Sequence, residues 1–410
     1  MTAAAELAGE EAIRDHQLRR LREGLPAVLR TNPFYRGRLR SVRRWGDFER
    51  LPFTTKADLA EDQRSHPPFG TDLTFPLERY VRLHQTSGTS GAEPLRWLDT
   101  AESWDWWSRI WAEHVYASAG LTAADRVFFA FSFGPFIGFW SAYAGAARVG
   151  AMAIPGGAMS TAQRVHAIHQ TGATALCCTP TYALRLAEAA AELGQDLAGS
   201  SLRLSVHAGE PGASIPATRA AIEAGLGVRA FDHTGMTELG PTGVSCPQRD
   251  GVHLIESEFI FEVVEGELVA TNLGRWGSPL VRYRTGDRVQ VARAPCSCGS
   301  PFLKVTGGLA GRVDDMFTVR GVNVFPSQVE DILRRRPEVG EFVIECRRIR
   351  QMDEATVLLE VAGGTDGEVL RATVAAELRA ALGVRLEVGV AVPGSLPRSE
   401  LKARRLVRIP

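Results

Sequence analysis

The chain has 410 residues, which exceeds what one hydrophobic core usually serves, so we expect two domains. Hydrophobic residues make up 45% and charged residues 23%, and the 47 basic side chains are balanced by 47 acidic ones. This composition is typical of a globular enzyme that acts on small molecules. The lack of a basic excess argues against nucleic acid as a partner.

The N-terminal 25 residues alternate in charge at helical spacing and have no apolar core, so they predict a helix and not a signal peptide. Segment 128–147 is uncharged and about as long as a membrane span. Its glycines and proline favour a buried strand, a turn and a buried helix instead. The 6 cysteines, without a signal sequence, indicate reduced or metal-bound thiols. We therefore expect a cytoplasmic protein with no membrane partner.

Residues 102–118 predict a helix that is rich in tryptophan and faces both the core and a cavity. From about residue 125, short apolar runs alternate with amphipathic helices. The expected strands are 126–132, 174–180, 202–210 and 228–235, and the expected helices are 160–171, 181–193 and 214–225. This alternation of strands and helices predicts an α/β fold with a mainly parallel sheet.

After about residue 250 the pattern changes to β-hairpins, at 258–273 and 287–295. A last block begins near residue 314. Its expected strands are 316–324, 341–349, 355–363 and 385–392, and its expected helices are 326–336 and 366–382. We predict a large α/β N-terminal domain with mainly parallel sheets and a β-hairpin region at 1–313. A small, mobile α+β C-terminal domain follows at 314–410.

One short loop is unusually rich in hydroxyl groups and glycine: Thr86, Ser87, Gly88, Thr89, Ser90 and Gly91. Its amides and hydroxyls suit the binding of phosphate groups, although such a loop can also be a solvated surface turn. Further polar clusters follow predicted strands, where ligands bind in open α/β sheets. They are HAGEP (207–211), DHTGMTELGP (232–241), RYRTGD (282–287), GRVDDMFTVRGVNVFPSQVE (311–330) and LPRSELKARR (396–405).

In this order and at these distances, the motifs resemble those of the adenylate-forming superfamily of acyl-CoA synthetases, in its phenylacetate–CoA ligase-like branch. The resemblance covers nearly the whole chain. It implies ATP-dependent activation of a carboxylic acid, which we expect to be aromatic, as an acyl-adenylate with release of pyrophosphate. A thiol, most often coenzyme A, then accepts the acyl group.

The resemblance also implies roles for individual residues. Lys402 corresponds to the catalytic lysine of the first half-reaction, Glu238 to the Mg²⁺-binding glutamate, and Asp287 to the carboxylate that binds the ribose. Arg312 would lie near the phosphates. Further nucleotide contacts are implied for Gly209, Glu210, Pro211, Asp232, His233, Thr234, Gly235, Met236 and Thr237. The hinge would be Asp314 and Asp315, and Arg320 and Gly321 would face the thiol after the small domain rotates. Taken alone, each motif has a structural alternative: a helix cap, a turn, a surface ion pair or a solvated basic run.

Three positions depart from the family pattern: Glu93 beside the phosphate loop, Thr234 where relatives have an adenine-stacking tyrosine, and Leu401 in place of a glycine. His233 is a candidate substitute for the missing tyrosine. These departures leave a carrier-protein thiol, an amine or another nitrogen nucleophile such as nitrite as alternative acceptors. A nucleotide-binding regulator without catalysis is a further alternative, against which the retained Lys402 argues. The identity of the acid stays open, and so does the oligomeric state, for which a homodimer is one alternative.

Cys246, His253, Cys296 and Cys298 form a Cys-x6-His and a Cys-x-Cys pair within the predicted hairpins. A set of three cysteines and one histidine is typical of closed, tetrahedral structural zinc sites. The alternative is unpaired loop cysteines and an unrelated histidine. We expect a structural Zn²⁺ ion here, whereas Cys177 and Cys178 lie on a predicted buried strand and are expected in the core.

Overall fold

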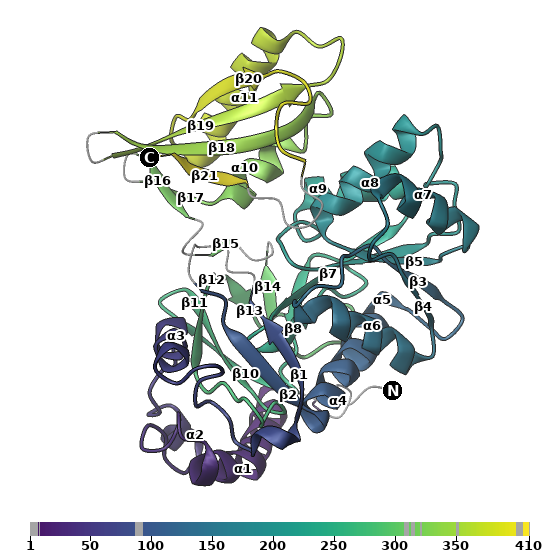
Figure 1. The fold of residues 1–410 in the computed structure, drawn as a ribbon. Helices are drawn as coiled ribbons and strands as arrows, with labels where there is room; N and C mark the ends of the chain where they lie inside the picture. The colour runs from purple at the N-terminus through teal and green to yellow at the C-terminus, as the bar shows by residue number, and fades with distance from the viewer. Residues whose placement is uncertain are drawn as a thin grey trace.

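The structure is a computed structural model that describes residues 7, 9–86, 93–306, 311–312, 316–319, 322–349, 352–398 and 405–409. A mixed sheet forms the centre of the larger part of the molecule, and a smaller α+β unit lies above it in the view of Figure 1. The predicted α/β fold class is confirmed. The boundary predicted after residue 313 lies outside the described residues and stays a prediction.

The central sheet has 9 strands in the order β13-β14-β9-β8-β7-β6-β5-β3-β4. Its parallel half consists of β3 (Arg126–Phe129), β4 (Met152–Pro155), β5 (Ala175–Cys178), β6 (Leu204–His207) and β7 (Arg229–Met236). Its antiparallel half consists of β8 (Gly240–Val244), β9 (Gly251–Leu254), β13 (Val291–Ala292) and β14 (Lys304–Thr306). Strands β5 and β6 are buried along their whole length, which is expected when helices cover both faces, whereas none of the four residues of the edge strand β4 is buried.

Helices cover both faces of the parallel half (Figure 1). They are α6 (Ile137–Val149) on one side, and α7 (Thr161–Gln170), α8 (Pro180–Glu192) and α9 (Pro216–Leu226) on the other. Local sequence fixes where two of them begin. Ser160 and Gln163 form a capping box at α7, and Thr179 caps α8 immediately before Pro180. The strand and helix expected within 128–147 are therefore found, as the end of β3 and α6.

The tryptophan-rich segment forms α4 (Ala101–Ile110), a π-helical turn at Trp111–Tyr116, and α5 (Ala117–Ala119). Trp106, Trp107 and Trp111 are buried in the core. Trp104 is only half-buried, beneath the guanidinium of Arg82.

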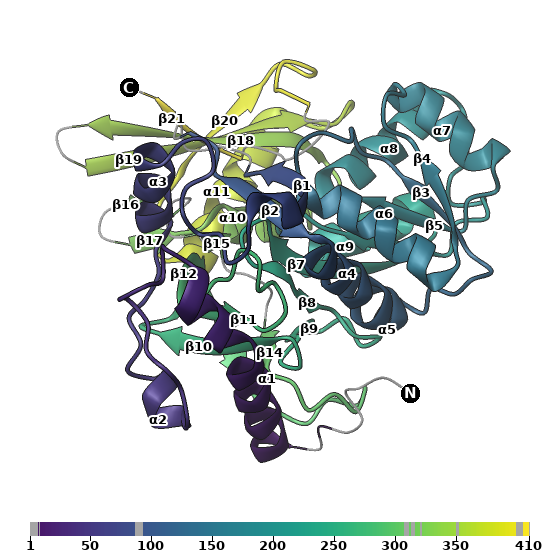
Figure 2. The same ribbon diagram turned by 60° about the horizontal axis from the view of Figure 1, so that its bottom comes forward.

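A second sheet has four strands in the order β10-β11-β12-β15. Its strands are β10 (Phe259–Val264), β11 (Glu267–Asn272), β12 (Tyr283–Arg288) and β15 (Gly311–Arg312). The hairpin of β1 (Tyr80–Gln85) and β2 (Arg96–Thr100) lies close by, and the N-terminal helices are α1 (Glu10–Thr31), α2 (Trp45–Phe48) and α3 (Lys56–Ser65). Figure 2 shows α1 at the end of the β10–β11 hairpin, where Gln17 donates hydrogen bonds to the carbonyls of Glu256 and Phe259.

The small unit has its own hydrophobic core, built from residues between 317 and 388. Its elements are β16 (Phe317–Val319), β17 (Val322–Val324), α10 (Pro326–Leu333), β18 (Val339–Ile349), β19 (Met352–Val361), α11 (Gly367–Leu382), β20 (Glu387–Ala391) and β21 (Leu406–Ile409). The strand predicted at 316–324 was wrong as one element, since β16 and β17 pair with each other in antiparallel fashion. Strand β21 was not predicted. Among the described helices, none is both long and apolar enough to cross a membrane.

Candidate active site

Two of the predicted nucleotide motifs meet at the carboxyl ends of neighbouring parallel strands. Gly209, Glu210 and Pro211 follow β6, and residues 232–237 form the end of β7 and the turn after it. Gly209 has a φ of 101°, a conformation that favours glycine. The Glu210 carboxylate accepts a hydrogen bond from the amide of Thr181 at 2.9 Å, in the first turn of α8. The topology therefore assembles one polar rim from separate stretches of sequence.

Asp232 is buried, and its carboxylate forms hydrogen bonds with the backbone of the protein itself. Its carboxylate oxygens accept hydrogen bonds from the amides of Ser214, at 2.9 Å, and His233, at 3.1 Å. Burial raises the pKa of Asp232 to about 6, and the hydrogen bonds from Ser214 oppose that rise. Asp232 thus ties the loop that precedes α9 to the end of β7.

His233 occupies a core position. Its ring centroid lies 4.4 Å from that of Trp111, and its Nδ1 lies 2.9 Å from the carbonyl oxygen of Gly243. Burial lowers the pKa of His233 to about 4, so the ring is neutral at pH 7. Because only 6% of His233 is exposed, the ring offers no open face to an adenine in this structure. Thr234 is half-buried, and its hydroxyl lies 3.2 Å from that of Thr242.

Glu238 lies in the turn after β7 and is 5% exposed. Its carboxylate makes no hydrogen bond or ion pair with another residue in the described part of the chain. A buried carboxylate left in this condition fits the oxygen ligand that Mg²⁺ requires. The carbonyls of Thr237 and Glu238 both accept hydrogen bonds from the guanidinium of Arg275.

Strand pairing brings Asp287 and Arg312 opposite each other. They are register partners in the antiparallel pair of β12 and β15. The amide of Asp287 donates to the Thr285 hydroxyl at 3.0 Å, which fixes the strand locally. Two residues that are 25 positions apart in sequence are thus adjacent at the edge of the site.

The phosphate loop is described only at its margins. Thr86 is buried at the end of β1, where its amide donates to the Leu95 carbonyl and its hydroxyl accepts from the Leu95 amide, both at 3.0 Å. Glu93 is exposed. The remaining predicted residues of the loop, hinge and lysine motif lie outside the described residues: Ser87, Gly88, Thr89, Ser90, Gly91, Asp314, Asp315, Arg320, Gly321, Leu401 and Lys402.

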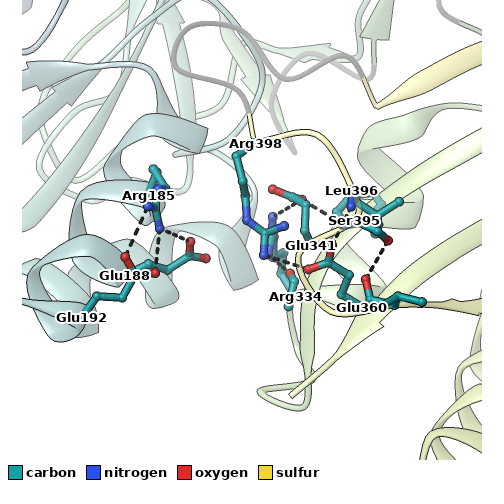
Figure 3. Close-up of polar contacts among 12 residues, drawn as sticks. Arg185, Glu188, Glu192, Arg334, Glu341, Glu360, Ser395, Leu396 and Arg398 are labelled. Carbon is teal, nitrogen blue, oxygen red and sulfur yellow. Dashed lines mark hydrogen bonds and ion pairs between the residues drawn. The ribbon is translucent and has the colours of Figure 1, made fainter. Parts of the chain in front are cut away.

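The segment before Lys402 is anchored at the boundary between the two parts of the molecule (Figure 3). Arg398 forms an ion pair with Glu360 at 2.8 Å, and the other Glu360 oxygen accepts from the Leu396 amide at 2.7 Å. Facing them, Arg185 of α8 pairs with Glu192 of the same helix at 3.0 Å. Side chains from α8 and from the small unit, Arg398 included, line a common shallow pocket.

The predicted Cys/His set comes together at one end of the antiparallel strands. The four ligand atoms of Cys246, His253, Cys296 and Cys298 all lie within 4.8 Å of one another. The sulfurs of Cys246 and Cys296 are 3.7 Å apart, and Cys298 Sγ lies 3.5 Å from Nε2 of His253. His253 directs its other ring nitrogen, Nδ1, to the Phe302 carbonyl at 3.3 Å. That contact orients the ring as in a metal-bound histidine.

Comparison with known proteins gives the family. Residues 321–408 match the AMP-binding enzyme C-terminal domain. A phenylacetate-coenzyme A ligase from Thermus thermophilus is 32% identical, over 95% of this chain and 95% of its own length. The chain belongs to the adenylate-forming superfamily, in its phenylacetate–CoA ligase-like branch. It is accordingly an AMP-forming acid–thiol ligase by family.

Solved structures of a family member also match, and they distinguish two arrangements. A 2-hydroxyisobutyryl-CoA ligase in the postadenylation state is 29% identical and superposes with a TM-score of 0.91, covering 100% of this chain and 90% of its own. The same enzyme in its thioesterification state reaches only 0.73, at 30% identity, with 98% and 91% covered. The chain as a whole therefore superposes better on the postadenylation structure of that enzyme than on its thioesterification structure.

Proposed function

We propose that this ligase activates an aromatic carboxylic acid with ATP, forming an acyl-adenylate and pyrophosphate, and then transfers the acyl group to coenzyme A. The observation that carries the proposal is full-length similarity to phenylacetate-coenzyme A ligases at 32% identity. The rim of polar groups at the ends of β6 and β7 supports it, because it lies where open α/β sheets bind their ligands.

The proposed chemistry distributes charge among residues from both domains. An acid oxygen attacks the α-phosphorus of ATP, and the bond from phosphorus to the pyrophosphate oxygen breaks as the mixed anhydride bond of the acyl-adenylate forms. Lys402 would bridge the two anionic reactants, and Asp287 would accept hydrogen bonds from the ribose. The phosphate loop and Arg312 would neutralise charge on the phosphates. Glu238 would hold Mg²⁺, which supplies further neutralisation of the triphosphate when it is bound.

Aromatic side chains that follow β3 support an aryl acid as substrate. The rings of Phe131 and Phe139 stack with centroids 3.5 Å apart, and Phe133 lies 4.9 Å from Trp140 and 5.6 Å from Tyr143. Part of this group is only half-buried, between the carboxyl end of β3 and helix α6. Such a cluster is suited to contact the face or edge of a substrate ring.

We also propose that the Cys246/His253/Cys296/Cys298 cluster holds one structural Zn²⁺. The donor set matches a closed tetrahedral site, and all six cysteines are free of disulfides. The ion would join the loop after β8, strand β9 and the loop before β14. Thiols kept for metal binding also support a cytoplasmic location, where cysteines stay reduced.

The function is tested by following pyrophosphate release over a panel of aryl and alkyl acids with ATP and Mg²⁺. Each acid is tested with coenzyme A, with simple amines and with nitrite, and the acyl product is identified by mass spectrometry. We expect aryl acids to give the fastest release and the coenzyme A thioester to be the product. Thioester formed only from short alkyl acids would contradict the substrate class, and an amide or N-acyl product would contradict the acceptor.

A further inference from the structure

A buried ion pair outside the predicted motifs lies directly beneath the turn that carries Glu238. Arg275 and Asp99 both have side chains with 0% exposure. Nε and one terminal nitrogen of Arg275 donate to the two carboxylate oxygens of Asp99, each at 2.7 Å. The guanidinium also lies 5.3 Å from the ring centroid of Trp97 and 5.2 Å from that of Trp107. The pair is therefore enclosed by aromatic side chains and held in one geometry.

The remaining guanidinium nitrogen of Arg275, Nη1, contacts the turn that carries Glu238. It donates to the carbonyl of Thr237 at 2.6 Å and to that of Glu238 at 3.0 Å. Because the planar guanidinium is fixed by Asp99, these hydrogen bonds define where the backbone of Glu238 lies. A lysine could not make this set of contacts, because its single nitrogen cannot lie within hydrogen-bond distance of both the Asp99 carboxylate oxygens and both carbonyls.

The same pair is continuous with the phosphate loop. Asp99 is on β2, which pairs with β1, and β1 ends at Gln85, immediately before Thr86, the first residue of that loop. Leu95, immediately before β2, exchanges hydrogen bonds with Thr86. Arg275 therefore connects the hairpin on both sides of the phosphate loop with the turn that carries Glu238, although these segments are about 140 residues apart in the sequence.

Stability alone is a poor explanation for this arrangement. Burial by itself would raise the pKa of Asp99, but the charge of Arg275 holds that pKa below its usual value, so the pair is ionised. Removing two charges from water is costly, and well-packed apolar residues often replace buried ion pairs without loss of stability. What apolar residues could not replace is the fixed placement of two backbone carbonyls.

We propose that Arg275, oriented by Asp99, is a positioning residue that sets the place of Glu238 relative to the β1–β2 hairpin, so that Glu238 can contact the metal of a Mg²⁺–triphosphate complex. This inference rests on the proposed function, in which Glu238 binds the metal. Arg275 acts through the backbone of Glu238 and touches no substrate itself.

The test compares ATP binding with and without Mg²⁺ by calorimetry, in the wild type and in Arg275→Lys, without acid present. The variant should bind the Mg²⁺–ATP complex about 10-fold more weakly, as changes behind metal ligands commonly do, while its affinity for metal-free ATP stays within about twofold. Hydrogen exchange of the ligand-free protein provides a second readout. The amides of residues 234–240 should exchange faster in the variant, because their carbonyl anchor is lost.

A control with the same pattern of hydrogen bonds, but with a partly exposed arginine, exists at the amino ends of the parallel strands. Arg203 donates to Asp125 through the same pair of nitrogens, at 3.0 and 2.6 Å, and also to the Gly120 carbonyl at 2.9 Å. Both residues precede their strands, β6 and β3, and so lie away from the carboxyl ends. Arg203→Lys should leave both the Mg²⁺ dependence and the exchange of residues 234–240 unchanged.

The outcomes separate the possibilities. Unchanged Mg²⁺–ATP affinity in Arg275→Lys would overturn the inference, as would an equal loss in Arg203→Lys, which would indicate general destabilisation. If Arg275→Lys does not fold, Asp99→Asn serves in its place, because the amide preserves size and loses the charge that orients the guanidinium. A wild type that binds no ATP at all would refute the proposed function instead.

Discussion

Three buried aspartates differ in pKa because burial is opposed to different extents. Desolvation raises the pKa of each carboxyl, but at Asp99 the charge and hydrogen bonds of Arg275, together with the nearby His84, outweigh it, so the pKa of Asp99 is lowered. At Asp232, amide donors limit the rise to about 6. Asp72 has a hydrogen bond from Asn32, at 2.9 Å, and its second oxygen has no partner in the described chain, so its pKa rises to about 8. The available donors, and not burial alone, decide which carboxylates stay charged.

Asp72 predicts a dependence of stability on pH. The folded carboxyl titrates near pH 8 and the unfolded one near 3.8, so between these values the folded state holds a proton that the unfolded state has released. The free energy of unfolding should therefore fall as the pH rises from about 4 to 8 and level off above it. Asp72→Asn removes this contribution. Thermal unfolding at pH 5, 6.5, 8 and 9 should show the melting temperature of the wild type falling relative to that of the variant, and parallel curves would contradict the assignment.

Some residues of the site could be predicted from the sequence, and others could not. The Cys/His set could be found because its residue types are rare and their spacing is diagnostic. Arg275 and Asp99 could not, because an arginine and an aspartate 176 positions apart carry no spacing signal until the fold joins them. His233 is a different case: its place in a nucleotide motif suggested an open ring, whereas the residue is 6% exposed in the structure and its ring lies beside Trp111.

At the scale of elements, helices α7 and α8 were predicted well, because each carries both an apolar face and a local start signal. Several short strands were not predicted, among them β4 and β21. None of the four residues of β4 is buried. Strand β21 pairs in parallel with β18, which lies about 60 positions earlier in the sequence. Strands of four residues are defined by their neighbours more than by their own sequence.

The metal cluster predicts how the hairpin region is held together. His253 pairs in register with both Val244 and Lys304, so β9 lies between β8 and β14. A metal bound to the side chain of His253 would therefore link β9 to the loops that flank β8 and β14. Protein purified without added metal should contain about one equivalent of zinc, and Cys296→Ser should lose it along with several degrees of melting temperature. Cys346→Ser, in the small domain and outside the cluster, should keep its zinc. A stable wild type that carries no metal would refute the site.

At the scale of the whole molecule, the small domain has a separate core, which allows it to move as a body. The chain as a whole superposes better on the postadenylation structure of a relative than on its thioesterification structure, with TM-scores of 0.91 and 0.73. The pair of Arg398 with Glu360 holds the chain leading to Lys402 on the small domain, beside α8. Rotation of that domain would therefore carry the lysine with it, as a two-step ligase requires.

The most direct test of this account separates the two half-reactions in Lys402→Ala. Acid-dependent exchange of pyrophosphate into ATP reports the first step, and thioester formation from a chemically prepared acyl-adenylate and coenzyme A reports the second. The account predicts that exchange falls by at least about 100-fold, the scale of losing one charged group at a reacting centre, while the second step stays within a few-fold of the wild type. Exchange at the wild-type rate, or equal loss of both steps, would contradict it.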